Sequence, residues 1–278
     1  MSEQEDQKVP EEESSTGMTF MGHLEELRWV LVRSAASICI AACAAFIGYK
    51  YVFDYILLGP KSPDFFTNRF MCYLSKVLDS PSFCINSKPL KLINIDMAGQ
   101  FNTHVQVSIY AGLILAFPYI IYQLWKFISP ALYDEERNKA RGAVLIISGL
   151  FIIGVLFGYY FITPFSVDFL SSYSISTQIE NTINLSSYIS LVSSLSLVSG
   201  LVFEMPVLVF FLTKIGIITP DFLKKYRRHA FIVILIIAAI ISPPDILSMT
   251  LISIPLWVLF EVSIIVSKRI IKKKATDV

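Results

Sequence analysis

Long apolar segments alternate with shorter polar ones along most of this chain. The first four segments each exceed twenty residues, enough for a helix to cross a hydrocarbon core of about 30 Å. The last two would extend only about 20 to 23 Å, so they should thin the bilayer locally or pack against protein. The pattern predicts six transmembrane helices, over about residues 29–53, 100–127, 142–163, 188–212, 230–242 and 246–260.

Prolines interrupt several of these segments. Pro118 removes a backbone donor inside the second predicted helix, which favours a kink, and Pro164 is expected to end the third. The tetrad Phe203-Glu204-Met205-Pro206 interrupts the fourth. We therefore predict an all-α polytopic membrane protein with kinked helices.

The two ends of the chain differ from the segment between them. Residues 1–17 contain six acidic side chains and few apolar ones, so burial cannot offset their ordering entropy and we predict a disordered tail. Residues 18–269 form the predicted membrane domain, and residues 270–278 a basic tail. Inside the membrane domain, residues 54–96 form a long polar connection.

Charge distribution predicts the orientation. The formal net charge of +1 conceals a segregation, because most of the 23 Lys and Arg fall in the connections after the second and fourth predicted helices and near the two termini. The opposite side has Lys and Arg only at Lys50 and in residues 54–96. By the positive-inside rule, both termini are expected in the cytoplasm, which requires an even number of spans.

Few carboxylates lie near the membrane on this basic side, and they form two main groups. Glu25 and Glu26 precede the first span, and Glu136 ends an acidic run in the connection after the second. An exposed carboxylate beside Arg usually forms only a weak surface ion pair. If the two segments were adjacent, however, Glu26 and Glu136 could together accept two guanidinium groups.

Three further acidic residues leave alternatives open. Glu204 lies near the membrane midplane, where it is either protonated and hydrogen-bonded within the bundle or facing a hydrated surface. Asp245 follows two prolines and either caps the last helix or contacts a partner. Glu261 is expected to snorkel or to form a local ion pair, with Lys268 near in sequence.

The four cysteines divide by position. Cys39 and Cys43 are expected to pack inside the first span. Cys72 and Cys84 fall in the polar connection on the external side, where an oxidising compartment would permit a disulfide. The sequence leaves open whether that disulfide forms.

Catalytic motifs are absent from the sequence. His23, His104 and His229 are isolated, and there is no H-E-x-x-H, G-x-S-x-G or phosphate-binding Gly-Lys loop. We therefore expect no enzymatic activity, no cofactor or metal, and no nucleic-acid partner.

Four sequence blocks, in one order across residues 18–269, resemble the signature of the TatC family. They are His23 to Arg28; Pro118 with the run Tyr122 to Tyr133 and Glu136-Arg137; Phe203 to Pro206; and Pro243-Pro244-Asp245 with Pro255 and Phe260-Glu261.

The resemblance implies a core receptor subunit of the twin-arginine translocase, which exports folded proteins across the bacterial inner membrane using the protonmotive force. It implies partners of the single-span TatA and TatB type, and self-association in a larger complex. The residues that it implies for signal-peptide binding are Leu24, Glu26, Arg28, Phe127, Pro130, Glu136 and Arg137. It also implies a concave bundle surface with an intramembrane polar or partner site at Glu204, Pro206 and Asp245.

A proton-coupled transporter of small solutes is the alternative hypothesis. Glu204, Asp245 and Glu261 would relay protons in such a protein. Secondary transporters commonly contain two similar halves, and we find no repeat between the first three predicted helices and the last three.

Overall fold

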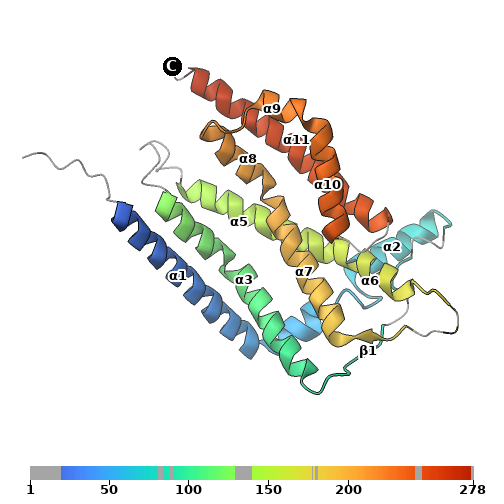
Figure 1. Ribbon diagram of the computed structural model, residues 1–278. Coiled ribbons are helices and arrows are strands. Elements are labelled where there is room, and N and C mark those ends of the chain that lie inside the picture. Colours follow the sequence, from blue (N-terminus) through green and yellow to red (C-terminus); the bar gives the residue numbers. More distant parts are fainter. Residues whose placement is uncertain are drawn as a thin grey trace, which may run out of the picture.

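The structure, a computed structural model, describes residues 20–80, 84–87, 90–128, 140–176, 178, 181–241 and 246–276. Helices dominate these residues (Figure 1), which confirms the predicted all-α class. The first half contains α1 (Phe20–Ile47), η1 (Tyr51–Leu57), α2 (Phe66–Val77), α3 (Gly99–Ile128), α5 (Ala140–Phe157) and η4 (Gly158–Ile162). The second contains α6 (Thr163–Ser172), α7 (Leu185–Phe203), α8 (Met205–Lys214), α9 (Pro220–Lys225), α10 (Arg227–Ile241) and α11 (Ile246–Thr276). Two short strands, β1 (Leu92–Ile93) and β2 (Ile183–Asn184), pair in parallel.

Four helical stretches among the described residues are long and apolar enough to cross a membrane. They are Met21–Ile47, Gly99–Ile128, Gly142–Ser172 and Leu185–Lys214, and they correspond to the first four predicted spans. α10 has only 15 residues, as short as expected. The count of six spans and the cytoplasmic location of both termini remain predictions.

Several boundaries differ from those predicted. α1 lies earlier in the chain than the expected 29–53, and the connection over 54–96 contains the helix α2. Pro164 does not end the third helix, because α6 continues directly from η4 and Pro164 occupies the first turn of α6. α11 continues beyond the predicted end at residue 260 to Thr276.

Glycines bring the helices to backbone contact at two places. A Cβ at Gly112 of α3 would lie 2.7 Å from the backbone N of Ala42 in α1, so these two helices touch without an intervening side chain. Between α5 and α7, a Cβ at Gly154 would lie 2.9 Å from the backbone Cα of Gly200. Such close approach stabilises helix pairs in lipid, where apolar burial supplies little driving force.

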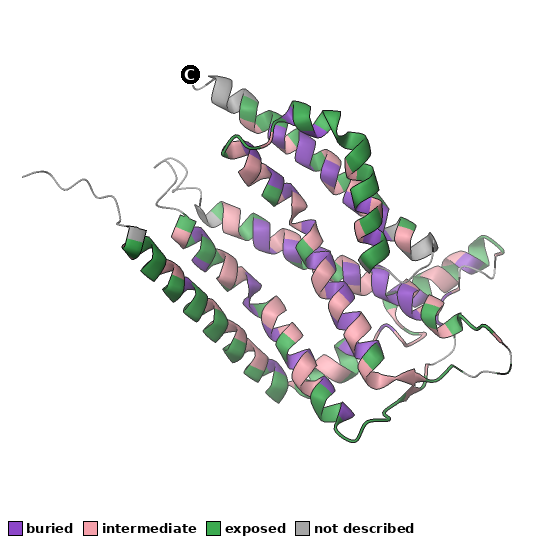
Figure 2. Cartoon of the chain, viewed as in Figure 1, coloured by how far each residue is buried: buried purple, intermediate pink, exposed green. Residues whose placement is uncertain are grey.

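The remaining helices pack outward from these two pairs. Phe117 of α3 stacks on Phe151 of α5, with ring centroids 3.6 Å apart. α8 to α11 form a second group, which buries Ile234, Leu256 and Ile264 in its core. Buried residues concentrate on α6 and α7 and on one face of α11, whereas α1 and α10 expose most of their surface (Figure 2).

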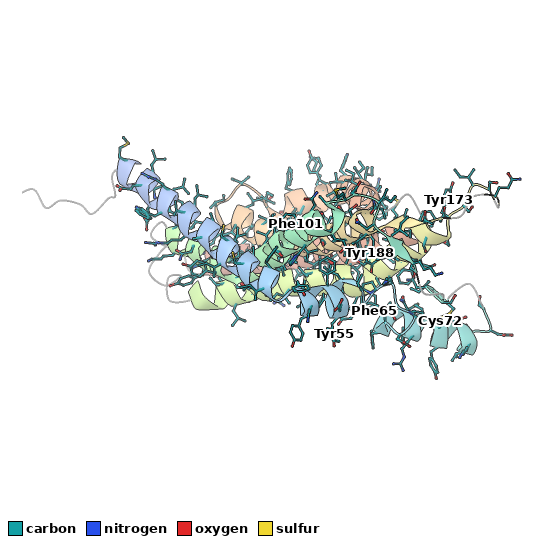
Figure 3. All side chains as sticks on the ribbon, turned by 90° about the horizontal axis from the view of Figure 1, so that it is seen from below. Tyr55, Phe65, Cys72, Phe101, Tyr173 and Tyr188 are labelled. Atoms are coloured by element: carbon teal, nitrogen blue, oxygen red, sulfur yellow. A yellow bond between two sulfur atoms is a disulfide. The ribbon has the colours of Figure 1, made fainter. Side chains whose placement is uncertain are left out.

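A polar network closes the end of the molecule where α1 terminates and α3 begins. Asn68 of α2 is fully buried and donates to the carbonyls of Pro60 and Ser62 at 3.0 and 2.7 Å. Asn86 donates its side-chain amide to Asn68 and to the carbonyl of Pro164, at 3.2 and 2.9 Å. Cys84, two residues before Asn86, forms a disulfide with Cys72 of α2 (Figure 3). We call this assembly, residues 51–80 and 84–87 together with α6, the external cap, after the side of the membrane that the charge distribution predicts for it.

The α1–α3 contact leads to a stability prediction. Gly112→Ala should lower the free energy of unfolding by about 1 to 3 kcal/mol, because the added methyl group meets backbone atoms of Ala42. Gly149→Ala is the matched control, since a Cβ there meets nothing within 4 Å. Denaturant titration of both variants in mild detergent measures the difference. Equal stability of the two variants would contradict the close packing of α1 on α3.

Candidate functional site: the junction of α1 and α3

The start of α1 lies against the end of α3. The imidazole of His23 stacks on the ring of Phe127, with centroids 4.3 Å apart and planes inclined by 19°. α1 and α3 run side by side up to this point (Figure 1). The start of α1, which carries Glu25 and Glu26, and the end of α3, which precedes the acidic run, are therefore adjacent. Pro130, Glu136 and Arg137 fall outside the described residues.

Glu26 lies one turn into α1 from His23 and has an unused acceptor. Its side chain is half-buried, and Oε2 is shielded from solvent without a hydrogen-bond partner. The neighbouring Leu24 and Arg28 are exposed. A shielded carboxylate oxygen without a donor favours binding of an incoming cation, and a guanidinium group supplies donors suited to it.

Two polar groups of α3 near this junction also lack partners, and the sequence analysis assigned them no role. Gln123 is buried and donates to the hydroxyl of Tyr119 at 2.6 Å, while its Oε1 accepts nothing. Trp125 is buried beside Phe211 of α8, and its indole N–H is unpaired. In the sequence, these two residues could have been noticed as two side chains with polar groups, two positions apart, near the end of an apolar span.

Glu204 occupies the break between α7 and α8, where the fourth predicted helix was expected to be interrupted. Its backbone N–H donates to Leu201 O at 3.2 Å, and its carbonyl accepts from Val207 N at 3.0 Å. Pro206 lies in the first turn of α8, where it needs no donor. Both carboxylate oxygens of Glu204 are shielded and make no hydrogen bond within the described structure. Asp245 lies outside the described residues.

The carboxylate of Glu261 is already engaged. Oε2 accepts from the guanidinium of Arg227 at 2.6 Å, joining α11 to the start of α10. The ion pair expected for Glu261 therefore forms, but with Arg227 and not with the sequence neighbour Lys268. Among the residues that the structure covers, no group of three or more His, Cys, Asp or Glu could hold a metal ion.

A shallow depression that is largely open at the surface lies between α3 and α7. Sequence reasoning missed it, although its serines recur every fourth residue on α7, which places them on one face of that helix. The lining residues are Gln106, Ser186, Ser187, Ser190, Leu191 and Ser194.

Comparison with known proteins gives consistent matches. The model of the family described as Sec-independent protein translocase protein (TatC) matches residues 22–255. A TatC protein of Blattabacterium is 44% identical over 259 residues, covering 92% of this chain and 97% of that protein. A TatC protein of Helicobacter pylori is 34% identical, covering 89% of this chain and 87% of the relative.

Two crystal structures of the twin-arginine translocase receptor TatC share the fold. One superposes with a TM-score of 0.67 at 32% sequence identity, covering 89% of this chain and 99% of the other. The second, determined in the detergent DDM, has a TM-score of 0.69 at 31% identity, with coverages of 88% and 99%.

Glu204 and Glu261 should respond differently to neutralisation of their carboxylates. Glu204→Gln should unfold at or above the temperature of the unchanged protein, because a neutral amide costs less to bury than an unpaired carboxylate. The matched control Glu261→Gln should lose up to about 1 kcal/mol, because it breaks the contact with Arg227. Thermal unfolding in detergent distinguishes the two. A loss of stability in Glu204→Gln as large as in the control would mean that the Glu204 carboxylate has a stabilising partner.

Proposed function

The chain belongs to the TatC family of Sec-independent protein translocase proteins, and from this premise we propose that it is the receptor for twin-arginine signal peptides. As a member of this family it is a multi-pass membrane component of the Tat translocase and not an enzyme. Its partners therefore belong to the Tat system. We propose that they include the signal peptides of folded cargo proteins, single-span subunits of the TatA and TatB type, and further copies of the chain.

The contact between His23 and Phe127 is the observation that supports the proposal most directly. It joins the turn that carries Glu26 to the last turn of α3. Glu136 follows the end of α3 by eight residues, which even fully extended span at most about 29 Å. Glu26 and Glu136 can therefore serve one ligand, and two carboxylates match the charge of two adjacent arginines.

The unused hydrogen-bond acceptor of Glu26 explains why binding of an arginine side chain would be favourable. Its shielded Oε2 has no donor in the described structure, so a guanidinium that fills the site removes the cost of that unpaired group. We propose that Leu24, Arg28, Phe127, Pro130 and Arg137 shape the surrounding surface. The cytoplasmic location of this junction, with both termini on the same side of the bacterial inner membrane, is part of the proposal.

Glu204, Pro206 and Asp245 form the proposed intramembrane site for partner helices. The support for Glu204 is its unpaired carboxylate at a helix break, because a partner helix that brings a donor would satisfy it. The transporter hypothesis is weaker, since Glu261, one of its three relay groups, is held by Arg227.

Charge reversal tests the signal-peptide site. Glu136→Lys, and more strongly the double change with Glu26→Lys, should reduce photocrosslinking to a signal peptide bearing Arg-Arg at least about tenfold, because each charged hydrogen bond contributes about 1.5 to 3 kcal/mol. A peptide bearing Glu-Glu in its place should regain crosslinking to the double variant. Crosslinking in membrane vesicles measures both.

Glu25→Lys provides the matched control for this experiment. Glu25 is adjacent to Glu26 but exposed, so its reversal changes the net charge as much as either single reversal does and should leave crosslinking within about twofold. Undiminished binding of the Arg-Arg peptide by the double variant would refute the carboxylate site.

A further inference from the structure

α2, in the external cap, carries its apolar side chains on its outer surface. Phe66, Phe70, Tyr73 and Val77 follow the spacing i, i+4, i+7 and i+11, which aligns them on one face of the helix. Their exposed fractions are 68, 51, 67 and 62%. We call these four residues the apolar stripe. A helix surrounded by water would be expected to bury such a stripe against the rest of its own protein.

The opposite face of α2 is polar and is fixed to the rest of the external cap. The hydroxyl of Thr67 donates to the carbonyl of Tyr160, and Asn68 donates to the carbonyls of Pro60 and Ser62. The disulfide of Cys72 with Cys84 ties the middle of α2 to the segment that follows it. α2 therefore cannot rotate to bury the apolar stripe without breaking these bonds.

Two cations border the apolar stripe on one side. Arg69 and Lys76 are separated by seven residues, so they project from the same flank of α2, and both are exposed. Neither forms an ion pair in the part of the chain that the structure describes. An apolar face with cations along its edge is typical of helices that lie in the plane of a membrane surface.

The position of α2 in the molecule also fits a helix that lies in the plane of a membrane surface. It lies at the end of the molecule where α1 leads into η1, and it runs crosswise to α1 and α3 (Figure 1). On η1, Tyr51 and Tyr55 are 74 and 76% exposed and stack at 6.2 Å. Exposed tyrosines at the end of a membrane-spanning helix are typical of the membrane–water interface. With 12 residues, α2 is too short to cross the bilayer.

We propose that α2 is an interfacial anchor in the external leaflet of the membrane. Phe66, Phe70 and Tyr73 insert at the boundary between acyl chains and headgroups, while Arg69 and Lys76 contact the phosphates of anionic lipids. A lipid surface fits better than a protein partner because cations border the apolar stripe and the exposed tyrosines of η1 lie at the same end of the molecule. The anchor holds the external cap against the membrane, independently of how the opposite end of the bundle binds its ligand.

Quenching of tryptophan fluorescence by lipid tests the insertion. Phe70→Trp, in the full chain, is reconstituted in nanodiscs of phosphatidylethanolamine and phosphatidylglycerol, with or without bromine on the acyl chains. Subtracting the signal of the unchanged protein removes its three native tryptophans. We expect brominated lipid to quench at least half of the added emission. Ser174→Trp is the control, because Ser174 is exposed in the connection that extends beyond α6 (Figure 1), and it should lose little.

Emission at position 70 that bromine does not quench would overturn the proposal. So would photocrosslinking of benzoylphenylalanine at position 70 to another polypeptide in native membranes instead of to lipid, because that result would identify a protein as the occupant.

Lipid analysis tests the cations separately. The double change Arg69→Gln and Lys76→Gln should reduce the phosphatidylglycerol that copurifies with the protein at least twofold. Lys91→Gln should leave the amount of copurified phosphatidylglycerol unchanged, because Lys91 is an exposed cation in the same connection but outside α2. Equal lipid retention in all variants would overturn the proposed headgroup contact.

Discussion

The direct contact between α1 and α3 at Gly112 and Ala42 determines where the rest of the structure can lie. Because no side chain separates the backbones there, the two helices stay close as far as His23 and Phe127. α3 then presents its other face to α5, through Phe117 on Phe151, and α5 meets α7 at a second glycine contact. In lipid, where burial of apolar surface contributes little, such close packing is the main source of affinity between helices.

Among the described residues, unpaired polar atoms occur at both proposed sites, and others lie elsewhere, on Ser34, Asn86, Ser148 and Ser166. Glu26, Gln123 and Trp125 near the α1–α3 junction, and Glu204 at the α7–α8 break, each keep a shielded polar atom without a partner. Every such atom costs free energy that the close helix contacts must offset. A ligand or partner helix that supplied the missing hydrogen bonds would remove that cost on binding. A component of a protein translocase is expected to bind other polypeptides, and the unpaired groups are where such binding would be favourable.

The two ends of the bundle are stabilised differently. The α1–α3 junction near Glu26 is held by the stacking of His23 on Phe127, whereas the external cap is held by the buried amides of Asn68 and Asn86 and by the disulfide of Cys72 with Cys84. Fixing the polar face of α2 inward leaves its aromatic residues outward, so the rigidity of the external cap and its proposed contact with lipid have one cause. The connection over residues 54–96 is polar on average, but it contains the amphipathic helix α2, whose apolar face points away from the rest of the protein.

The sequence alone determined the class of the protein, the first four spans, the break at Glu204 and the family. These depend on local features: long apolar runs, a proline after a glutamate, and short motifs in a fixed order. Tertiary structure decided the rest. Whether Pro164 ends a helix, whether Glu261 pairs with Lys268 or Arg227, and whether Cys72 reaches Cys84 depend on which segments lie together, and separation along the chain does not specify that. The junction of His23 with Phe127 is the clearest case, since more than one hundred residues separate two rings that stack because a glycine lets their helices touch.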